Sequence, residues 1–391
     1  MKIAMFGGSF NPPHMGHVEA ARSVIASIHP DRLLIMPTCV SPHKAMAGDT
    51  PPPEKRLELC RLAFAGLPEA EVSDLEMRRA GKSYTVDTLQ QLKELYPDAE
   101  LTLVMGTDMI LSLESWKDPE TIMQLAQIAV LLREDGEKDA VLKQIDHLQT
   151  VYDAKVQLLE AAVYPATSTE IRAELKQAEK PAELGEEEYA YIVKHLLYGA
   201  RAELCSLREK GLAMLKPNRV KHVLGVEQEA VKLAKRWGED EYMAAAAGIL
   251  HDCTKKLTTD EQLNLCKKYG IILDTFEEGF EKALHQMTGA AVAEHEFGAC
   301  KAICEAIRWH TTAKPEMTTL EKVVYLADYI EPNRDFEGVD RMRVISYQDL
   351  DLAMEEGLRM TMEDLRSKHA HVLEESQRAY DWFKSRREGL Y

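Results

Sequence analysis

A short segment near the N-terminus restricts the fold more than any other part of this sequence. An apolar run, Ile3–Phe6, leads directly into the turn Gly7–Phe10, and apolar residues at helical spacing follow in Val18–Ile25. This pattern predicts a buried parallel strand, a glycine turn and a helix start, an arrangement that turns backbone N–H groups toward phosphate. His14 and His17 flank the predicted helix start, where the helix dipole disfavours a charged imidazolium unless an anion is near. The alternative interpretation is a tight turn with two solvated histidines.

Composition limits the class of protein. A chain of 391 residues is long enough for two domains, and its formal net charge of −17 argues against a general nucleic-acid binder. The cysteines have no Cys-x-x-Cys spacing, which favours free thiols in a reducing cytosol. No signal peptide precedes the first predicted strand, and no run of about 18 apolar residues could span a membrane. We therefore expect a cytoplasmic protein that binds neither nucleic acid nor a membrane.

Strands and helices alternate through the first half of the chain. Further buried strands are predicted at Arg32–Pro37, Leu101–Met105, Ile128–Leu132 and Val156–Leu159. The helical spacing between them predicts an α/β fold with a doubly wound parallel sheet of the Rossmann-like type. The amphipathic segment Glu186–Gly199 is expected to form the last helix of this region, with Gly199 at its C-cap.

Polar residues follow these strands, at the edge where open α/β sheets bind ligands. Lys44 follows the second strand, and Gly106 and Asp108 follow the Leu101–Met105 strand. An aspartate there can accept hydrogen bonds from ribose hydroxyls or help to hold Mg²⁺. A Ser or Thr in Ser83–Thr85 is expected to cap the next helix. A solvated loop lysine remains the alternative for Lys44.

A capping box predicts one more helix start. Thr167 and Glu170 have the spacing of a box in which each satisfies a backbone N–H group of the other. This would place Arg172 in the first turn, where the helix dipole disfavours a cation. A bound anion would resolve that conflict.

The segment Gly7–His17 (GGSFNPPHMGH) resembles the His-x-Gly-His signature of nucleotidylyltransferases and, among them, of bacterial nicotinate-nucleotide adenylyltransferases. Similar family motifs occur at Pro42–Lys44, Ser83–Thr85 and Thr167–Arg172, with Ser41 in place of a proline and Thr167 in place of a serine. Over residues 1–200 the resemblance implies Mg²⁺-dependent adenylyl transfer from ATP to nicotinate mononucleotide. It implies catalytic roles for His14, His17, Lys44 and Arg172, and nucleotide binding by Gly7, Gly8, Ser9, Phe10, Tyr84, Thr85, Gly106, Asp108, Trp116, Ser168 and Thr169. A simple core aromatic remains the alternative for Trp116, and the preference for nicotinate over nicotinamide rests on the resemblance alone.

From Cys205 onward the periodicity is helical nearly throughout. Six polar groups lie at the edges of apolar helical stretches: His222, His251, Asp252, His285, His310 and Asp328. Imidazole and carboxylate groups that enter the interior of a helical bundle need a partner, and a divalent transition metal suits both. Any one of these histidines alone would be read as a satisfied core residue, but six such groups in order favour a metal site.

The order His…His-Asp…Asp resembles the HD-domain phosphohydrolases. His251–Lys255, His310–Thr312 and Leu326–Pro332 resemble their branch of symmetrical diadenosine-tetraphosphate hydrolases, with Ala313 in place of a glycine. The resemblance implies that residues 201–391 form an all-α HD domain with catalytic roles for Asp252 and Lys255. A first metal would be held by His222, His251, Asp252 and Asp328, and a second supported by His285 and His310. Iron suits this mixed ligation, with Mn, Co and Ni left open, and Lys255 and Arg334 are candidates for holding phosphates.

The two halves together predict a bifunctional enzyme whose small-molecule substrates are ATP, nicotinate mononucleotide and diadenosine tetraphosphate. Two alternatives stay open for the second half, because short HD domains carry little substrate information. It could act on another nucleoside phosphate or alarmone, or it could sense a nucleotide without hydrolysing it. The oligomeric state, including a homo-oligomer, is also left open.

Overall fold

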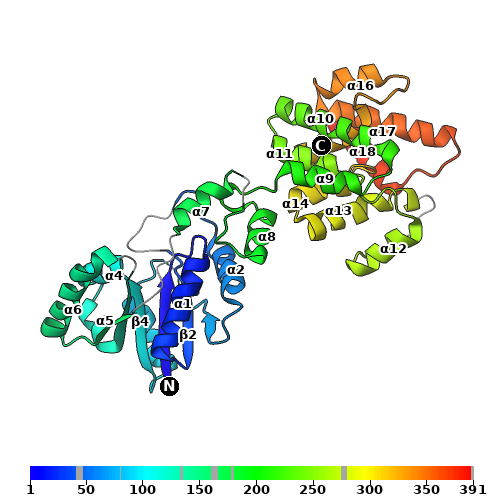
Figure 1. The fold of residues 1–391 in the computed structure, drawn as a ribbon. Coiled ribbons are helices and arrows are strands. Elements are labelled where there is room, and N and C mark those ends of the chain that lie inside the picture. The colour runs from blue at the N-terminus through cyan, green and yellow to red at the C-terminus, as the bar shows by residue number, and fades with distance from the viewer. Residues whose placement is uncertain are drawn as a thin grey trace. The chain divides into compact units, whose positions relative to one another are not determined.

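The computed structural model describes residues 1–40, 47–79, 81–132, 135–159, 166–177, 180–273 and 280–388. The chain forms two compact units, Met1–Arg201 and Ala202–Tyr391 (Figure 1). The first unit contains a six-stranded sheet, and the described part of the second contains helices without strands. Within the described ranges, no helix has the length and apolar character needed to cross a bilayer.

The sheet of the first unit is parallel throughout, in the order β3-β2-β1-β4-β5-β6. Its strands are β1 (Lys2–Gly8), β2 (Arg32–Pro37), β3 (Ala70–Val72), β4 (Glu100–Gly106), β5 (Ala126–Leu131) and β6 (Val156–Leu159). The order reverses direction between β1 and β4, which confirms the predicted doubly wound, Rossmann-like sheet. The β3 strand was not predicted, because three residues are too short to show a pattern.

Each face of the sheet carries its own core, because alternate residues of a strand point to opposite faces. Ile3 and Met5 belong to one hydrophobic cluster, and Ala4 and Phe6 belong to the other. Buried side chains of α1 (Met15–Ile28) and α2 (Pro53–Phe64) join the second cluster. The first cluster takes side chains from α3 (Thr85–Leu95), α4 (Thr107–Ser112), α5 (Pro119–Leu125) and α6 (Lys138–Tyr152). The unit also contains α7 (Ser168–Leu175) and α8 (Glu186–Lys194).

Two predicted helix caps in this unit are wrong. Helix α3 has Tyr84 at its N-cap with no side-chain cap, and the Ser83 hydroxyl instead accepts a hydrogen bond from the Cys39 N–H group at 3.2 Å. Helix α8 ends at Lys194, and Gly199 closes a separate short 3₁₀ turn. In both cases a tertiary or backbone contact decides the end of the helix, and the local sequence does not.

The second unit is a helical bundle, as predicted. Its helices are α9 (Leu204–Ala213), α10 (Pro217–Trp237), α11 (Glu241–Leu250), α12 (Thr259–Lys268), α13 (Leu284–Phe297), α14 (Lys301–Arg308), α15 (Thr319–Ile330), α16 (Val339–Ser346), α17 (Leu350–Ser367) and α18 (Glu374–Arg387). Helix α10 packs on α11 and α15, and α14 packs on α11, α13 and α15. Proline at the first position of α10 and Gly238 at its end, with φ of 71°, fix its two ends.

The buried carboxyl group of Glu188 gives the first unit a testable pH dependence. Its Oε2 accepts a hydrogen bond from the Gly185 N–H group at 3.0 Å, and burial raises its pKa to about 7. Because the folded-state pKa exceeds the ordinary value of 4.5, stability is full below that value and falls as pH rises through about 7. We expect Glu188→Gln to stabilise the first unit by about 2–3 kcal/mol at pH 8 and to have little effect at pH 4. Hydrogen exchange of the α8 amides at both pH values measures this, and an equal effect at the two would contradict it.

Candidate active sites

The first candidate site lies at the carboxyl ends of β1 and β4. Gly8 ends β1 and Gly106 ends β4, and these neighbouring strands are where the strand order reverses. Open parallel sheets bind their ligands at this point. Asp108 is exposed in the first turn of α4, where the positive end of the helix dipole favours its charge.

His14 is the N-cap of α1. Its Nδ1 accepts a hydrogen bond from the Gly16 N–H group at 3.1 Å, so in the neutral ring the hydrogen is on Nε2. The ring centroids of His14 and His17 are 4.0 Å apart, and His17 packs against Phe10 at 5.0 Å. Two imidazoles therefore lie together at the positive end of a helix, where donors can meet an anion.

A buried arginine fixes the turn between β1 and α1. Arg56 on α2 is only 1% exposed, and its guanidinium donates to the Ser9 carbonyl at 2.8 Å and the Thr38 carbonyl at 2.7 Å. Phe10 adopts a φ of 43° and its side chain is buried, so only its backbone can meet a nucleotide. Arg56 was not predicted, because one arginine in an amphipathic helix gives no signal of its tertiary partners.

Helix α7 lies against the same turn. Its capping box is confirmed, with Thr167 as N-cap. The Ser168 hydroxyl donates to the Pro12 carbonyl at 3.0 Å, and Arg172 Nη1 donates to the Asn11 carbonyl at 2.6 Å. The predicted place of Arg172 in the first turn is wrong: α7 ends after eight residues, so Arg172 lies in its last turn, which the dipole favours for a cation. The helix dipole therefore gives no reason for an anion at Arg172, and contact with the β1 turn is what places Arg172 near the site.

The remaining residues predicted for this site lie in different surroundings. Lys44 lies outside the described residues. The Tyr84 ring lies 4.7 Å from the Lys117 ammonium, and Thr85 begins α3. Trp116 is 9% exposed and belongs to a core cluster, so its stacking on a ligand stays a prediction. Thr169 Oγ1 accepts from Arg172 Nη2 at 3.2 Å.

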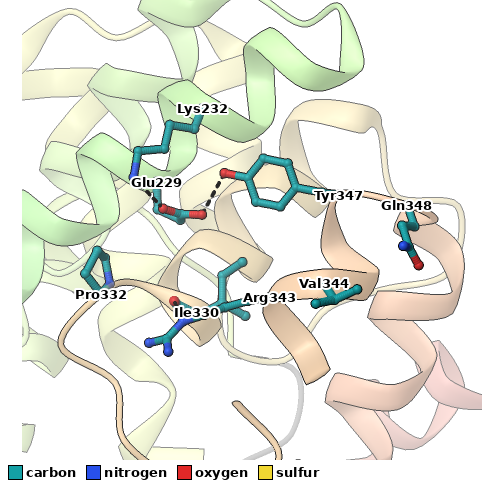
Figure 2. Close-up of a pocket in the computed structure, with 8 residues that line it drawn as sticks. All are labelled: Glu229, Lys232, Ile330, Pro332, Arg343, Val344, Tyr347 and Gln348. Atoms are coloured by element: carbon teal, nitrogen blue, oxygen red, sulfur yellow. Dashed lines mark hydrogen bonds and ion pairs between the residues drawn. The ribbon is translucent and has the colours of Figure 1, made fainter. Parts of the chain in front are cut away.

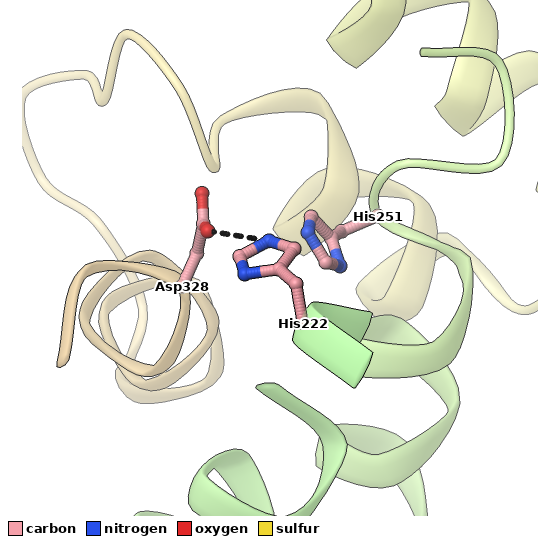
Figure 3. Close-up of side chains that lie close together, drawn as sticks. All are labelled: His222, His251 and Asp328. Carbon is pink, nitrogen blue, oxygen red and sulfur yellow. Dashed lines mark ion pairs between the residues drawn. The ribbon is translucent and has the colours of Figure 1, made fainter. Parts of the chain in front are cut away.

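The second candidate site gathers all six of the predicted polar groups of the helical unit. His222 lies on α10, His251 and Asp252 follow α11, His285 lies on α13, His310 follows α14, and Asp328 lies on α15. Close packing of α10 on α11 contributes, because a side chain at Gly248 would lie 3.0 Å from the Glu227 Cα atom. Figure 3 shows how His222 on α10, His251 just after α11 and Asp328 on α15 point toward one another.

All four imidazoles present the same ring nitrogen to the cluster. Nδ1 of His251, His285 and His310 lies 2.8, 2.9 and 2.7 Å from the carbonyl oxygen three residues before it. Nδ1 of His222 lies 3.1 Å from Glu331 Oε1. A carbonyl oxygen can only accept, so His251, His285 and His310 carry the hydrogen on Nδ1 and turn an Nε2 lone pair inward. Nδ1 of His222 faces a carboxylate that can accept in the same way.

Asp252 divides these nitrogens into two pairs. Its Oδ2 lies 3.9 Å from His222 Nε2 and 3.6 Å from His251 Nε2, while its Oδ1 lies 3.4 Å from His285 Nε2 and 3.8 Å from His310 Nε2. Nε2 of His285 and Nε2 of His310 are 3.2 Å apart, and the Thr311 hydroxyl lies 3.2 Å from the first and 3.1 Å from the second. The buried His251 Nε2 has no hydrogen-bond partner among the described residues. The donor set thus fits divalent transition metal ions.

The ionisation states of these side chains also suit metal binding. Burial lowers the pKa of His251 to about 4 and that of His285 well below its usual value, so both rings are neutral near pH 7. Burial alone would raise the pKa of Asp252, but the neighbouring imidazoles and the Lys255 ammonium hold it well below its usual range. Neutral imidazole and ionised carboxylate are the forms that bind metal.

Cationic side chains surround the cluster. Arg334 Nη2 donates to Asp328 Oδ1 at 2.5 Å, and Lys255 Nζ lies 2.8 Å from His285 Nε2. Arg219 pairs with Asp252 Oδ2. Arg219 was not predicted, although its position three residues before His222, on the same face of α10, was a signal that could have found it.

Metal addition is expected to stabilise the second unit. In the metal-free protein, carboxylate oxygens and imidazole lone pairs face one another, and a bound ion removes that repulsion only in the folded state. At 100 times its dissociation constant, an ion that binds only the folded chain adds about 2.7 kcal/mol. We expect Mn²⁺ to raise the thermal unfolding temperature of the second unit and a chelator to reverse the rise. An unchanged transition at saturating metal would contradict this.

Comparison with known proteins gives two family matches. Residues 5–174 match the cytidylyltransferase-like model, and residues 219–333 match the HD domain model. A Lachnoclostridium phytofermentans protein described as "Probable nicotinate-nucleotide adenylyltransferase" is 32% identical over 50% of this chain and 98% of its own length. The symmetrical bis(5′-nucleosyl)-tetraphosphatase of Bacillus subtilis is 36% identical over 46% of this chain and 98% of its own length.

One relative spans both units. A Mycoplasma pneumoniae protein described as "Probable nicotinate-nucleotide adenylyltransferase/Ap4A hydrolase" is 28% identical over 93% of this chain and 98% of its own length.

Proposed function

Since this chain belongs to the nicotinate-nucleotide adenylyltransferase family in its first unit and to the HD superfamily in its second, we propose that it is a bifunctional enzyme. The first unit transfers the adenylyl group of ATP to nicotinate mononucleotide, giving deamido-NAD and pyrophosphate. The second unit hydrolyses diadenosine tetraphosphate symmetrically to two ADP. The relative that matches across both units supports the pairing of these activities. The observation that supports the hydrolase activity is that four imidazole Nε2 atoms lie around Asp252.

Adenylyl transfer needs no covalent intermediate with the protein. The 5′-phosphate of the mononucleotide attacks the α-phosphorus of ATP, and the bond to the β-phosphate breaks as pyrophosphate leaves. Such reactions depend on positioning and on neutralising charge on the phosphate oxygens. We assign that task to His14, His17, Lys44, Arg172 and the Mg²⁺ that accompanies ATP. The histidines stabilise charge and do not act as bases, because the attacking phosphate is already ionised.

The rest of the nucleotide site positions the substrates. Backbone amides of the Gly7–Phe10 turn meet ATP phosphates, and Asp108 accepts hydrogen bonds from ribose hydroxyls or helps to hold Mg²⁺. Ser168 and Thr169 add to the phosphate site at the α7 start. Backbone amides near Tyr84 and Trp116 read the nicotinate carboxylate, with Trp116 offering its face to the pyridine ring.

For the hydrolase, His222, His251, Asp252 and Asp328 would hold one metal ion, and His285 and His310 would support a second. Divalent ions bound there would lower the pKa of bound water and draw charge from the attacked phosphate. Lys255 and Arg334 hold neighbouring phosphates, since both cations lie at the cluster. Iron is the metal that we favour for this ligand set.

The deciding experiment incubates metal-loaded full-length protein with diadenosine tetraphosphate and separates the nucleotide products. Two ADP is the expected result. ATP plus AMP would keep a hydrolase but overturn the symmetrical cut. No product, with bound metal confirmed by elemental analysis, would overturn this substrate in favour of a nucleotide sensor or another nucleoside phosphate.

A further inference from the structure

A carboxylate outside the six-residue cluster holds one of its histidines. Glu331 directly follows α15 and is only 1% exposed. Its Oε1 lies 3.1 Å from Nδ1 of His222. Its Oε2 accepts two hydrogen bonds from Asn333, one from the backbone N–H group at 2.7 Å and one from Nδ2 at 2.8 Å. A buried carboxylate with this many partners has a fixed position.

Helix α10 is shaped to receive this carboxylate. Gly225 lies one turn after His222, and a Cβ atom added there would overlap Glu331 Oε2 and lie 3.0 Å from Asn333 Nδ2. Asn333 Nδ2 also reaches the Lys221 carbonyl of the same helix at 3.3 Å. Glycine inside a helix costs about 1 kcal/mol relative to alanine. The close approach of Glu331 and Asn333 is what Gly225 makes room for.

His222 differs in this respect from the other three histidines of the cluster. Nδ1 of His251, His285 and His310 is held by a main-chain carbonyl three residues earlier, which any sequence would supply. Nδ1 of His222 is held by a charged side chain from another segment. A carboxylate partner fixes the tautomer and makes the imidazole a stronger electron donor than a carbonyl partner does.

A second carboxylate faces the other ring nitrogen. His222 Nε2 lies 3.1 Å from Asp328 Oδ1, the same distance as Nδ1 from Glu331 Oε1. A metal ion shared by His222 Nε2 and Asp328 requires the ring hydrogen on Nδ1, and Glu331 is placed to accept it there. The Glu331–His222 contact thereby favours the tautomer in which His222 and Asp328 can act as adjacent metal ligands.

We propose that Glu331 is a positioning residue for the metal site, which orients His222, sets its tautomer and strengthens binding of the ion shared with Asp328. Asn333 and the space at Gly225 hold Glu331 in place. The inference rests on the proposal that the histidine cluster holds metal. A purely structural carboxylate is the competing interpretation, and it would affect folding without a selective effect on one metal ion.

Glu331→Gln in the full-length chain tests this with Co²⁺, whose visible absorption reports its ligands independently of catalysis. We expect the affinity for one of two Co²⁺ ions to fall about 10–100-fold, with a changed absorption spectrum, while the other ion binds nearly as before. Excess metal should restore occupancy. Binding of both ions with unchanged affinity and spectrum would overturn the inference, whereas a wild-type chain that binds no Co²⁺ would overturn the metal-site proposal itself.

The chain supplies a matched control carboxylate on α10, the helix that carries His222. Glu229 is buried like Glu331, and it accepts a hydrogen bond from the Tyr347 hydroxyl at 2.8 Å. It lines a pocket of about 650 Å³ with Lys232, Ile330, Pro332, Arg343, Val344, Tyr347 and Gln348 (Figure 2). Glu229→Gln is expected to leave both Co²⁺ affinities unchanged. An equal loss in both variants would mean a general effect of removing a buried charge and would overturn the inference.

A variant at an exposed position gives a second test that does not depend on a substitution in the core. Asn333 is exposed, and Asn333→Ala removes a donor to Glu331 without touching either charge or histidine. We expect a weaker but selective loss for the same Co²⁺ ion, about threefold to tenfold, with an unchanged melting temperature in the metal-free chain. A lower metal-free melting temperature with unaltered Co²⁺ binding would support the structural interpretation and overturn ours.

Discussion

Replacing His251 with alanine is expected to lower diadenosine tetraphosphate hydrolysis by about 10³-fold or more. His251 is fully buried and belongs to both groups of potential metal ligands, one with His222 and Asp328 and the other with Asp252 and His310. The His251→Ala variant therefore lacks a potential metal ligand near both Asp252 and Asp328. Adenylyl transfer should keep its wild-type rate, because the residues that we propose for it lie in the other unit.

The measurement is the rate of ADP formation at saturating metal, with deamido-NAD synthesis measured on the same sample. His295→Ala is the matched control, since His295 lies on α13 and stacks on Tyr269 at 4.7 Å without joining the cluster. It should keep both activities. Hydrolysis by His251→Ala within about tenfold of wild type would contradict the assignment of His251 as a metal ligand.

Short-range patterns were enough to predict much of this molecule. The Ile3–Phe6 run, the glycine turn and the helix from Met15 appear as expected, since period and turn chemistry are local properties. The six polar groups of the second half were found because each lies at the edge of an apolar helical stretch, and burial of a polar group demands a reason.

Errors arose where a distant partner decides the outcome. Ser83 caps no helix because its hydroxyl accepts from Cys39, which is 44 positions away. Arg172 was placed in the wrong turn because nothing in the local sequence shows that α7 stops at Leu175. Arg56 and Glu331 were missed because their roles consist of contacts made after folding. Arg56 donates to the Ser9 and Thr38 carbonyls, and Glu331 faces an imidazole on α10.

The second large effect is expected in the first unit. We expect His14→Asn to lower kcat for deamido-NAD synthesis by about 10²–10³-fold, the usual cost of removing one donor to a developing oxyanion. Nδ1 of His14 caps α1 by accepting from the Gly16 N–H group, which leaves Nε2–H as the donor at the positive end of the helix. Asparagine can keep the cap but is too short to present a donor at the same place. Diadenosine tetraphosphate hydrolysis should be unaffected.

Two comparisons separate the catalytic role of His14 from its capping role. His14→Ala should lose the same activity and also about 1 kcal/mol of stability, because alanine removes the cap as well. His29→Asn alters the opposite end of α1, where His29 is exposed with a left-handed φ of 48° that asparagine tolerates, and should change neither quantity. If His14→Asn kept wild-type kcat while His14→Ala lost both activity and stability, capping would be the function of His14. Equal losses of kcat in the two variants, with stability lost only in His14→Ala, would place the effect on the Nε2–H donor.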